Sequence, residues 1–144
     1  MNSRAAKLMQ DANVWVYRKT GGKLGGRFGG APVLLLTTRG RKSGKPRVTP
    51  LLYLADGNDV VVVASKGGWP THPLWYRNLQ ADPAVEVQIG RDVRALRART
   101  ANPDERRRLW PLLVKSYAMY ADYQSWSDRE IPVVILEQPT ARPS

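Results

Sequence analysis

The sequence contains no cysteine and only one histidine among its 144 residues. The absence of cysteine excludes a disulfide framework, a thiol nucleophile and cysteine-ligated zinc or iron–sulfur centres. A single histidine, His72, excludes a multi-histidine metal site and leaves any histidine-based catalytic triad dependent on that residue. We therefore expect no metal centre.

Acidic residues are also scarce, since 12 Asp and Glu face 23 Lys and Arg and give a net charge of +11. A charge of this sign and size favours anionic partners. The candidates are a phosphorylated or carboxylated small molecule, nucleic acid or a membrane surface. Charge alone does not choose among them.

Long apolar runs are missing as well. The longest, residues 31–36 and 60–64, are far too short to cross a bilayer. The start of the chain lacks an apolar core followed by a small-residue cleavage site. We therefore expect a cytoplasmic protein.

The length suits one domain with its own core. Residues 1–20 predict an amphipathic helix that packs on the domain, although it could also touch a membrane surface transiently. Its apolar stripe comprises Ala5, Leu8, Met9, Ala12 and Val16. The glycine-rich residues 21–30 predict a mobile connector or lid. Residues 31–138 then form the main domain, and residues 139–144 form a tail.

Turn signals and alternating apolar residues divide the main domain into short strands. Strands are expected over 32–38, 48–55, 60–65, 84–89, 93–99 and 131–137. Helices are expected over 71–80, with Leu74 and one aromatic facing the core, and over 103–123, kinked or split at Pro111. The predicted class is mainly β with flanking helices, as a small, partly open antiparallel barrel.

The most informative stretch is a dense basic loop, Arg39-Gly-Arg-Lys-Ser-Gly-Lys-Pro-Arg47, with five cations in nine positions. Guanidinium, ammonium, hydroxyl and backbone donors together bind phosphate or clustered carboxylates. The alternative is a solvated hairpin turn. The spacing matches neither the dinucleotide-binding glycine motif nor the nucleoside triphosphate P-loop.

Three stretches carry a family resemblance: Thr37–Pro50, Ala64-Ser-Lys-Gly-Gly68 and His72-Pro-Leu-Trp-Tyr-Arg-Asn78. They are supported by Val14-Trp-Val-Tyr17, Asp122-Tyr-Gln-Ser-Trp126 and Ile131-Pro-Val-Val134. Over about residues 12–137 the sequence resembles the deazaflavin (F420)-dependent nitroreductase and quinone reductase family. That family lies within the flavin/deazaflavin oxidoreductase split-barrel superfamily.

The resemblance implies a split β-barrel that binds coenzyme F420 in a groove, with the anionic tail of the coenzyme on the basic loop. It implies these cofactor-binding residues: Arg39, Arg41, Lys42, Ser43, Arg47, Thr49, Ser65, Lys66, Gly67, Gly68, Pro73, Trp75, Tyr76 and Asn78. Helical spacing makes either Trp75 or Tyr76 structural. His72 either contacts the coenzyme tail or satisfies the start of the short helix.

The same resemblance implies that Ser65, Tyr117, Tyr120 and Tyr123 are the catalytic residues. From spacing alone, the three tyrosines are either a core stripe or the wall of a substrate pocket. Leu52 and Tyr53 point in opposite directions from one strand, so only one of them can line the groove.

The implied function is reduction by hydride transfer from the reduced deazaflavin to an electron-poor acceptor. Quinones, activated enones such as unsaturated lactones, and nitroaromatics all fit this chemistry. The alternatives are a flavin mononucleotide barrel and a non-enzymatic nucleic-acid-binding barrel, although the motifs do not support specific nucleic-acid binding. A homodimer is also compatible with the superfamily.

Overall fold

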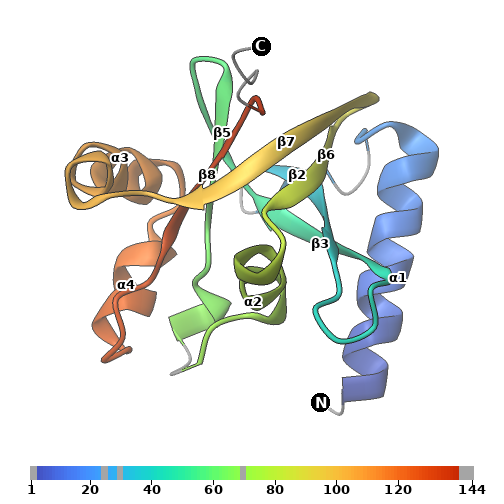
Figure 1. Ribbon diagram of the computed structural model, residues 1–144, viewed down its shortest axis with the longest axis horizontal. Helices are drawn as coiled ribbons and strands as arrows, with labels where there is room; N and C mark the ends of the chain where they lie inside the picture. Colours follow the sequence, from blue (N-terminus) through green and yellow to red (C-terminus); the bar gives the residue numbers. More distant parts are fainter. Residues whose placement is uncertain (1–2, 24–25, 29–30, 69–70, 140–144) are drawn as a thin grey trace.

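The structure is a computed structural model that describes residues 3–23, 26–28, 31–68 and 71–139. Its strands form one eight-stranded antiparallel sheet with helices on either side (Figure 1). The helices are α1 (Ser3–Thr20), the 3-10 turn η1 (Lys66–Gly68), α2 (Leu74–Ala81), α3 (Pro103–Ser116) and α4 (Met119–Ser125). The strands are β1 (Arg27–Phe28), β2 (Ala31–Arg39), β3 (Pro46–Leu52), β4 (Leu54–Asp56), β5 (Asp59–Val63), β6 (Ala84–Ile89), β7 (Asp92–Thr100) and β8 (Val133–Glu137).

The sheet curls but does not close. Its strand order is β1-β2-β6-β7-β8-β5-β4, and β3 also pairs with β2. No ladder among the described strands joins β3 to β4. The chain itself bridges the opening, because β3 runs into β4 through Tyr53. The predicted antiparallel, mainly β class is confirmed, and the single strand expected over 48–55 is instead two strands with different partners.

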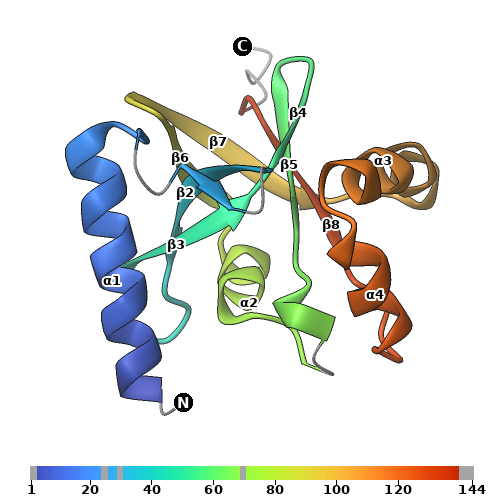
Figure 2. The ribbon, with the colours of Figure 1, turned by 180° about the vertical axis from the view of Figure 1, so that it is seen from behind.

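The two apolar runs are buried on both faces, which explains why they read as continuous apolar segments. Along β5, Val60 and Val62 face the inner core, whereas Val61 and Val63 face α3 and α4. Strand β2 divides in the same way between the inner core and α1. The sheet is therefore the middle layer of the molecule, with α1 on one side and α3 and α4 on the other (Figure 2).

Helix α1 packs on the sheet with a different face from the predicted one. Val14 and Tyr17 are buried, while Ala12 is exposed and Val16 is only half-buried. The side chains of Ala5, Leu8 and Met9 lie outside the described residues. Tyr17 decides this orientation, because its hydroxyl donates to the Val33 carbonyl oxygen at 3.0 Å and accepts from the Gly90 N–H at 2.8 Å.

The described part of the predicted 21–30 connector is tied to the fold. The Gly22 N–H donates to the Tyr17 carbonyl oxygen at 2.9 Å, and Arg27–Phe28 pairs with β2 as β1. The described positions of this segment therefore take part in backbone hydrogen bonds, and a mobile connector or lid stays a prediction. No helix within the described ranges is long and apolar enough to cross a membrane.

Helix α2 closes one end of the inner core (Figure 1). Both of its aromatics, Trp75 and Tyr76, are buried, and Leu74 is 69% exposed. The expectation that Leu74 faces the core was therefore wrong. The inward side of α2 is instead formed by Trp75 and Tyr76 with Asn78 and Leu79, which are all buried.

The predicted 103–123 helix is divided into α3 and α4. The start is as expected, because Asn102 and Glu105 form a reciprocal capping box with Pro103 at the first position. Pro111 lies inside α3, and the break falls at Tyr117–Ala118. The prediction that the helix is split was correct, but the predicted position of the split, Pro111, was wrong. Leu109 and Leu113 flank Pro111 and are fully buried, so packing on β5 and β8 keeps α3 continuous through the proline.

Candidate functional site

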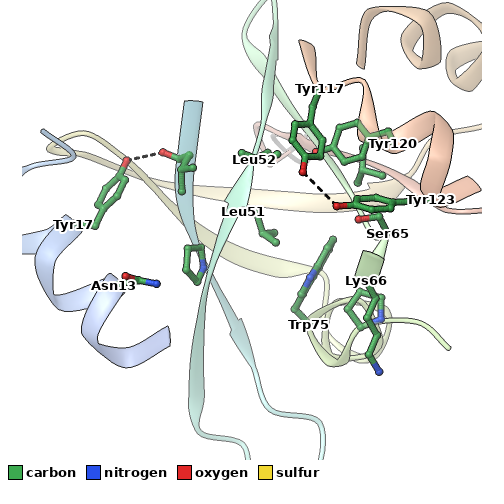
Figure 3. Close-up of a pocket in the computed structure, with 14 residues that line it drawn as sticks. Asn13, Tyr17, Leu51, Leu52, Ser65, Lys66, Trp75, Tyr117, Tyr120 and Tyr123 are labelled. Atoms are coloured by element: carbon green, nitrogen blue, oxygen red, sulfur yellow. Dashed lines mark hydrogen bonds between the residues drawn. The ribbon is translucent and has the colours of Figure 1, made fainter. Parts of the chain in front are cut away.

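A cavity of about 500 Å³ lies beside the end of β3 and the turn after β5 (Figure 3). Its volume is in the range of small-molecule and cofactor sites. Segments far apart in the sequence meet there: the second half of α1, β2, β3, the turn after β5, the start of α2, and the α3–α4 tyrosines. The lining residues are Asn13, Tyr17, Val33, Pro50, Leu51, Leu52, Val63, Ser65, Lys66, Pro73, Trp75, Tyr117, Tyr120 and Tyr123.

The floor of the cavity is apolar. Leu51 packs toward the inner core, whereas Leu52 touches the clusters under α1 and under α3. Both residues line the cavity, and Tyr53 does not. Leu51 and Leu52 face opposite sides of the strand, yet both reach the cavity, so strand alternation alone does not decide which residues of this segment line it. Together with Trp75 these side chains give flat, apolar surfaces of the kind that accept a planar ring.

A tight corner follows β5 and brings polar groups to the cavity. Lys66 has a backbone φ of +45°, a conformation that is uncommon for a residue with a side chain. Gly68 has φ +80°, and a Cβ there would lie 2.7 Å from the Tyr123 carbonyl oxygen. Glycine is therefore needed for the corner to approach α4. Its N–H donates to the Ser65 carbonyl oxygen at 2.9 Å, so Gly68 holds the corner closed.

Three tyrosines form the opposite wall. The Tyr117 and Tyr123 hydroxyls are 3.3 Å apart, and the Tyr117 and Tyr120 rings are edge-to-face at 5.1 Å. Burial raises the pKa of Tyr120 above its ordinary value. The hydrogen bond with Tyr117, followed by burial, raises the pKa of Tyr123 to about 12. Both phenols are therefore protonated at neutral pH and able to donate a hydrogen bond.

Helix α2 contacts both the cavity and the basic loop, through residues that lie about one turn apart. Trp75 lines the cavity, and Asn78 lies three positions later on the same side of the helix. The Asn78 Oδ1 accepts from the Arg41 N–H at 3.2 Å, and its Nδ2 donates to the Thr38 hydroxyl at 3.2 Å. Asn78 therefore holds the basic loop beside the helix that lines the cavity. Tyr76 turns away, because its hydroxyl is 2.8 Å from that of Thr100.

The basic loop is a well-formed turn that points its charges into solvent. The Gly40 N–H donates to the Lys45 carbonyl oxygen at 2.8 Å, and the Lys45 N–H donates to the Ser43 hydroxyl at 3.2 Å. Arg41, Lys42 and Arg47 are exposed. Among the described ion pairs, the loop takes part in one, between Arg39 and Asp82 at 3.9 Å. Its remaining charge is available to an anion.

The structure therefore divides the predicted site residues into groups. It brings to the cavity Ser65, Lys66, Pro73, Trp75, Tyr117, Tyr120 and Tyr123. It places along the adjacent β2–β3 hairpin Arg39, Arg41, Lys42, Ser43, Arg47 and Thr49. It uses Gly68, Tyr76 and Asn78 within the protein, while Gly67 is part of η1.

The sequence did not predict the α1 residues that line one end of the cavity, nor an arginine that contacts two of the segments around it. Asn13 and Tyr17 reach the cavity from α1, across the boundary predicted at residue 20. The Val14–Tyr17 motif was the available signal for that end. The Arg129 guanidinium donates to the Ser65 carbonyl oxygen at 2.8 Å and lies 3.2 Å from His72 Nδ1. No local pattern marked Arg129.

A curled, open antiparallel sheet with an apolar, tyrosine-walled cavity of about 500 Å³ beside a cationic loop has the form of a small-molecule binding site. Comparison of the sequence with family models matches residues 9–138 to the F420H(2)-dependent quinone reductase model. The chain belongs to this family.

Individual relatives agree with that assignment. The chain is 54% identical over 105 residues to Rv3178 of Mycobacterium tuberculosis, covering 73% of this chain and 88% of the relative. It is 44% identical over 125 residues to the F420H(2)-dependent quinone reductase Rv1261c of that species, covering 84% of each. Among solved structures, the F420-H2 dependent reductase FDR-A matches with a TM-score of 0.69 and 47% identity, over 74% of this chain and 94% of that chain.

Proposed function

We propose that this protein is an F420H2-dependent reductase that passes a hydride from the reduced deazaflavin to an electron-poor acceptor held in the cavity. The observation that carries the proposal is the arrangement of the site. An apolar floor from Leu51, Leu52 and Trp75 faces a tyrosine wall, and Ser65 and Lys66 add polar groups at the corner. Family membership supplies the cofactor class.

The residues present fit a deazaflavin coenzyme in charge and in shape. The apolar walls suit a tricyclic ring, and Lys66 adds a cation at the cavity. Arg39, Arg41, Lys42, Ser43 and Arg47, with Thr49, would hold the phosphate and glutamate tail. Exposed cations with few acidic partners suit an anion that extends along the surface.

The reduced deazaflavin supplies the hydride when it is bound. The protein must orient the acceptor, exclude water and stabilise the negative charge that develops on the acceptor oxygen. Tyr117 and Tyr123 present linked hydroxyls for that purpose, with Ser65 on the facing corner. Tyr120 is largely buried behind them, and its ring supports the other two.

Among the acceptors we favour quinones over activated enones and nitroaromatics. Leu52 gives the floor an apolar surface that suits a quinone ring. Transient contact of α1 with a membrane would bring the site to lipid-borne quinone, and Trp15 on α1 is 61% exposed. Trp15→Ala would then lower activity on vesicle-borne quinone more than on a soluble quinone. Equal losses on both would argue against the membrane contact.

We also propose a homodimer. A solved structure that is 38% identical, with a TM-score of 0.72 over 92% of this chain and 99% of that chain, is described as a domain-swapped dimer. Light scattering of the purified protein over a range of concentrations tests this state for the present chain. A monomer at every concentration would exclude it.

The decisive experiment is titration of the purified protein with the deazaflavin coenzyme and, in parallel, with flavin mononucleotide, by tryptophan fluorescence at two salt concentrations. Trp75 in the cavity makes quenching the natural signal. Saturable, salt-sensitive preference for the deazaflavin, followed by quinone-dependent oxidation of its reduced form, is the expected result. Preference for the flavin indicates a flavin barrel. Binding of neither, with salt-sensitive attachment to single-stranded nucleic acid, indicates a non-enzymatic protein.

Variants of the tyrosine wall test the proposed roles. Tyr123→Phe removes one hydroxyl and keeps the ring, so the packing against Trp126 and Gly68 remains. We expect a loss in kcat of roughly 10- to 100-fold with little change in coenzyme affinity. Tyr76→Phe is the matched control, because that hydroxyl is 2.8 Å from the Thr100 hydroxyl and Tyr76 does not line the cavity. Unchanged turnover in Tyr123→Phe would remove it from the catalytic set.

A further inference from the structure

Arg129 lies outside the cavity and contacts two segments that shape it. Its Nη2 donates to the Ser65 carbonyl oxygen at 2.8 Å, and its Nη1 lies 3.2 Å from His72 Nδ1. Ser65 begins the corner of the cavity, and His72 directly precedes Pro73, which lines it at the entrance to α2. One guanidinium therefore joins the corner to the start of α2.

The backbone of Arg129 is itself fixed to the third wall of the cavity. Its carbonyl oxygen accepts from Gln124 Nε2 at 2.9 Å, and Gln124 belongs to α4, next to Tyr123. The Gln124 Oε1 accepts from the Ile131 N–H at 2.8 Å and from Arg106 Nη2 at 3.1 Å. These bonds hold residues 129–131 against α3 and α4. The backbone of Arg129 is thus held in place by α4, the helix that carries Tyr120 and Tyr123.

The corner that Arg129 contacts has a strained backbone. Lys66 adopts φ +45°, which usually costs free energy for a residue other than glycine. The Ser65 carbonyl oxygen accepts two hydrogen bonds, from the Gly68 N–H within the corner and from Arg129 outside it. The second bond is charge-assisted and therefore the stronger kind. Its loss would leave a strained corner closed by one short turn.

The geometry at His72 requires a neutral imidazole with its proton on Nε2, because Nδ1 must accept from Arg129. Arg129 and Arg77 are the charged groups that act on it, and the Tyr76 ring packs 4.9 Å away. Burial, followed by these two cations, lowers the pKa of His72. The neutral form is thus favoured, and Arg129, as an arginine, stays charged at neutral pH.

We propose that Arg129 is a positioning residue that sets the spacing between the Ser65–Lys66 corner, the start of α2 and the tyrosine wall. The proposal deepens the proposed function and rests on it, since the spacing matters because an acceptor and a coenzyme must lie between these walls. Arg129 does not line the cavity, and the basic loop that would hold the coenzyme tail is elsewhere. Its effect is therefore on orientation rather than on tail binding.

Three substitutions separate orientation from folding. Arg129→Gln removes the charge, Arg129→Lys keeps it without the two-pronged geometry, and Arg129→Gly leaves a space for guanidinium ion added to the solution. The control is Arg108→Gln. Arg108 also pairs through both of its terminal nitrogens, with Asp56 at 3.1 and 2.8 Å, and it does not line the cavity.

We expect each Arg129 variant to lose kcat with a soluble quinone by roughly 10- to 100-fold, because a displacement of about 1 Å has effects of that size. Coenzyme affinity should stay within about threefold of wild type, since charges at the surface loop are unchanged. Millimolar guanidinium should restore part of the activity of Arg129→Gly and leave wild type and Arg108→Gln unaffected. Chemical rescue of this kind identifies a local role that general destabilisation would not produce.

Wild-type kcat in Arg129→Gln and Arg129→Lys, or equal losses in those variants and Arg108→Gln, would overturn the proposal. Absence of rescue in a folded Arg129→Gly protein would also overturn it. The titration of the wild-type protein with the coenzyme is done first, because it tests the proposed function separately. A wild type that binds no deazaflavin refutes the proposed function, and this proposal with it, whereas normal wild-type activity with insensitive Arg129 variants refutes this proposal alone.

Discussion

Two arginine-rich regions of this molecule are in opposite electrostatic situations. In the basic loop, residues 39–47, the cations are exposed, and one described ion pair, Arg39–Asp82, involves them. On β7 and α3, by contrast, every arginine from 106 to 108, as well as Arg99, has a carboxylate partner. The loop is therefore suited to bind an external anion, and the β7–α3 face is already neutralised by its own acids.

Part of the difference is local, since Asp104 and Glu105 pair with Arg107 and Arg99, and part arises from contacts between distant parts of the chain. Arg108 pairs with Asp56, 52 positions away, and Arg99 pairs with Glu137, 38 positions away. Both acids reach the face only through the sheet. A count of charges in a sequence window thus overstates the anion-binding capacity of the β7–α3 face. For the basic loop the same count is correct.

The largest expected effect comes from removing charge from the loop. Replacing Lys42 and Arg47 together by alanine should weaken coenzyme binding by roughly 100-fold, equivalent to about 2.7 kcal/mol, through loss of two charge-assisted contacts. The remaining binding should be less sensitive to salt. Fluorescence titration at low and high salt measures both. The control, Arg107→Ala on α3, should bind normally, and unchanged affinity of the double variant would contradict the tail assignment.

A smaller loss of coenzyme affinity should follow from introducing an acidic residue into the basic loop. Lys45→Glu would place a carboxylate among Arg41, Lys42 and Arg47 and so make the loop resemble the β7–α3 face. We expect coenzyme affinity to fall by about tenfold, with thermal stability nearly unchanged at this exposed turn. The matched variant Lys45→Gln should fall less. Equal effects of Glu and Gln would mean that the loop does not act through charge.

The β7–α3 face should respond in stability and not in binding. Arg99→Gln removes the partner of both Glu105 and Glu137, which accept at 2.7 and 3.0 Å. Because the group is partly exposed, we expect a loss of only about 1 kcal/mol in the free energy of unfolding. Denaturant unfolding measures it. Coenzyme affinity should match wild type, and a clear loss of binding would show that the two regions are not independent.

The smallest expected effect is on the pH dependence of the free energy of unfolding, through Glu105 on the β7–α3 face. Hydrogen bonds from Arg99, followed by one from the Asn102 N–H, lower the pKa of Glu105 from 4.5 to about 2. This carboxylate therefore adds stability that is complete above pH 4.5 and is lost as the pH falls toward 2. Glu105→Gln keeps the capping-box geometry and should flatten this part of the stability profile. A profile identical to wild type would remove Glu105 from the acid response.

Much of the candidate site followed from the sequence because its signals are local. Ser65 and Lys66 follow a strand, Trp75 lies in a short helix, and three tyrosines recur every third residue. The structure brings all of them to one cavity. The basic loop was equally visible, since a turn with five cations needs no tertiary contact to be recognised.

The errors came from places where packing competes with a local rule. Pro111 was expected to break its helix, but buried Leu109 and Leu113 hold α3 together, and the chain breaks at Tyr117–Ala118 instead. The predicted stripe of α1 was displaced because the hydroxyl of Tyr17 binds the sheet. Leu74 is exposed because Trp75 and Tyr76 both fill the inward side of α2.

The sequence by itself determined the class of fold, the positions of most strands, the basic loop and the family, because alternation, turn residues and ordered motifs act over a few neighbouring residues. The tertiary structure alone decided which cations are neutralised, which aromatics reach the cavity and that Arg129 joins Ser65 to His72. Those outcomes depend on contacts across tens of positions, and their energies are set by distance, burial and geometry in the folded chain.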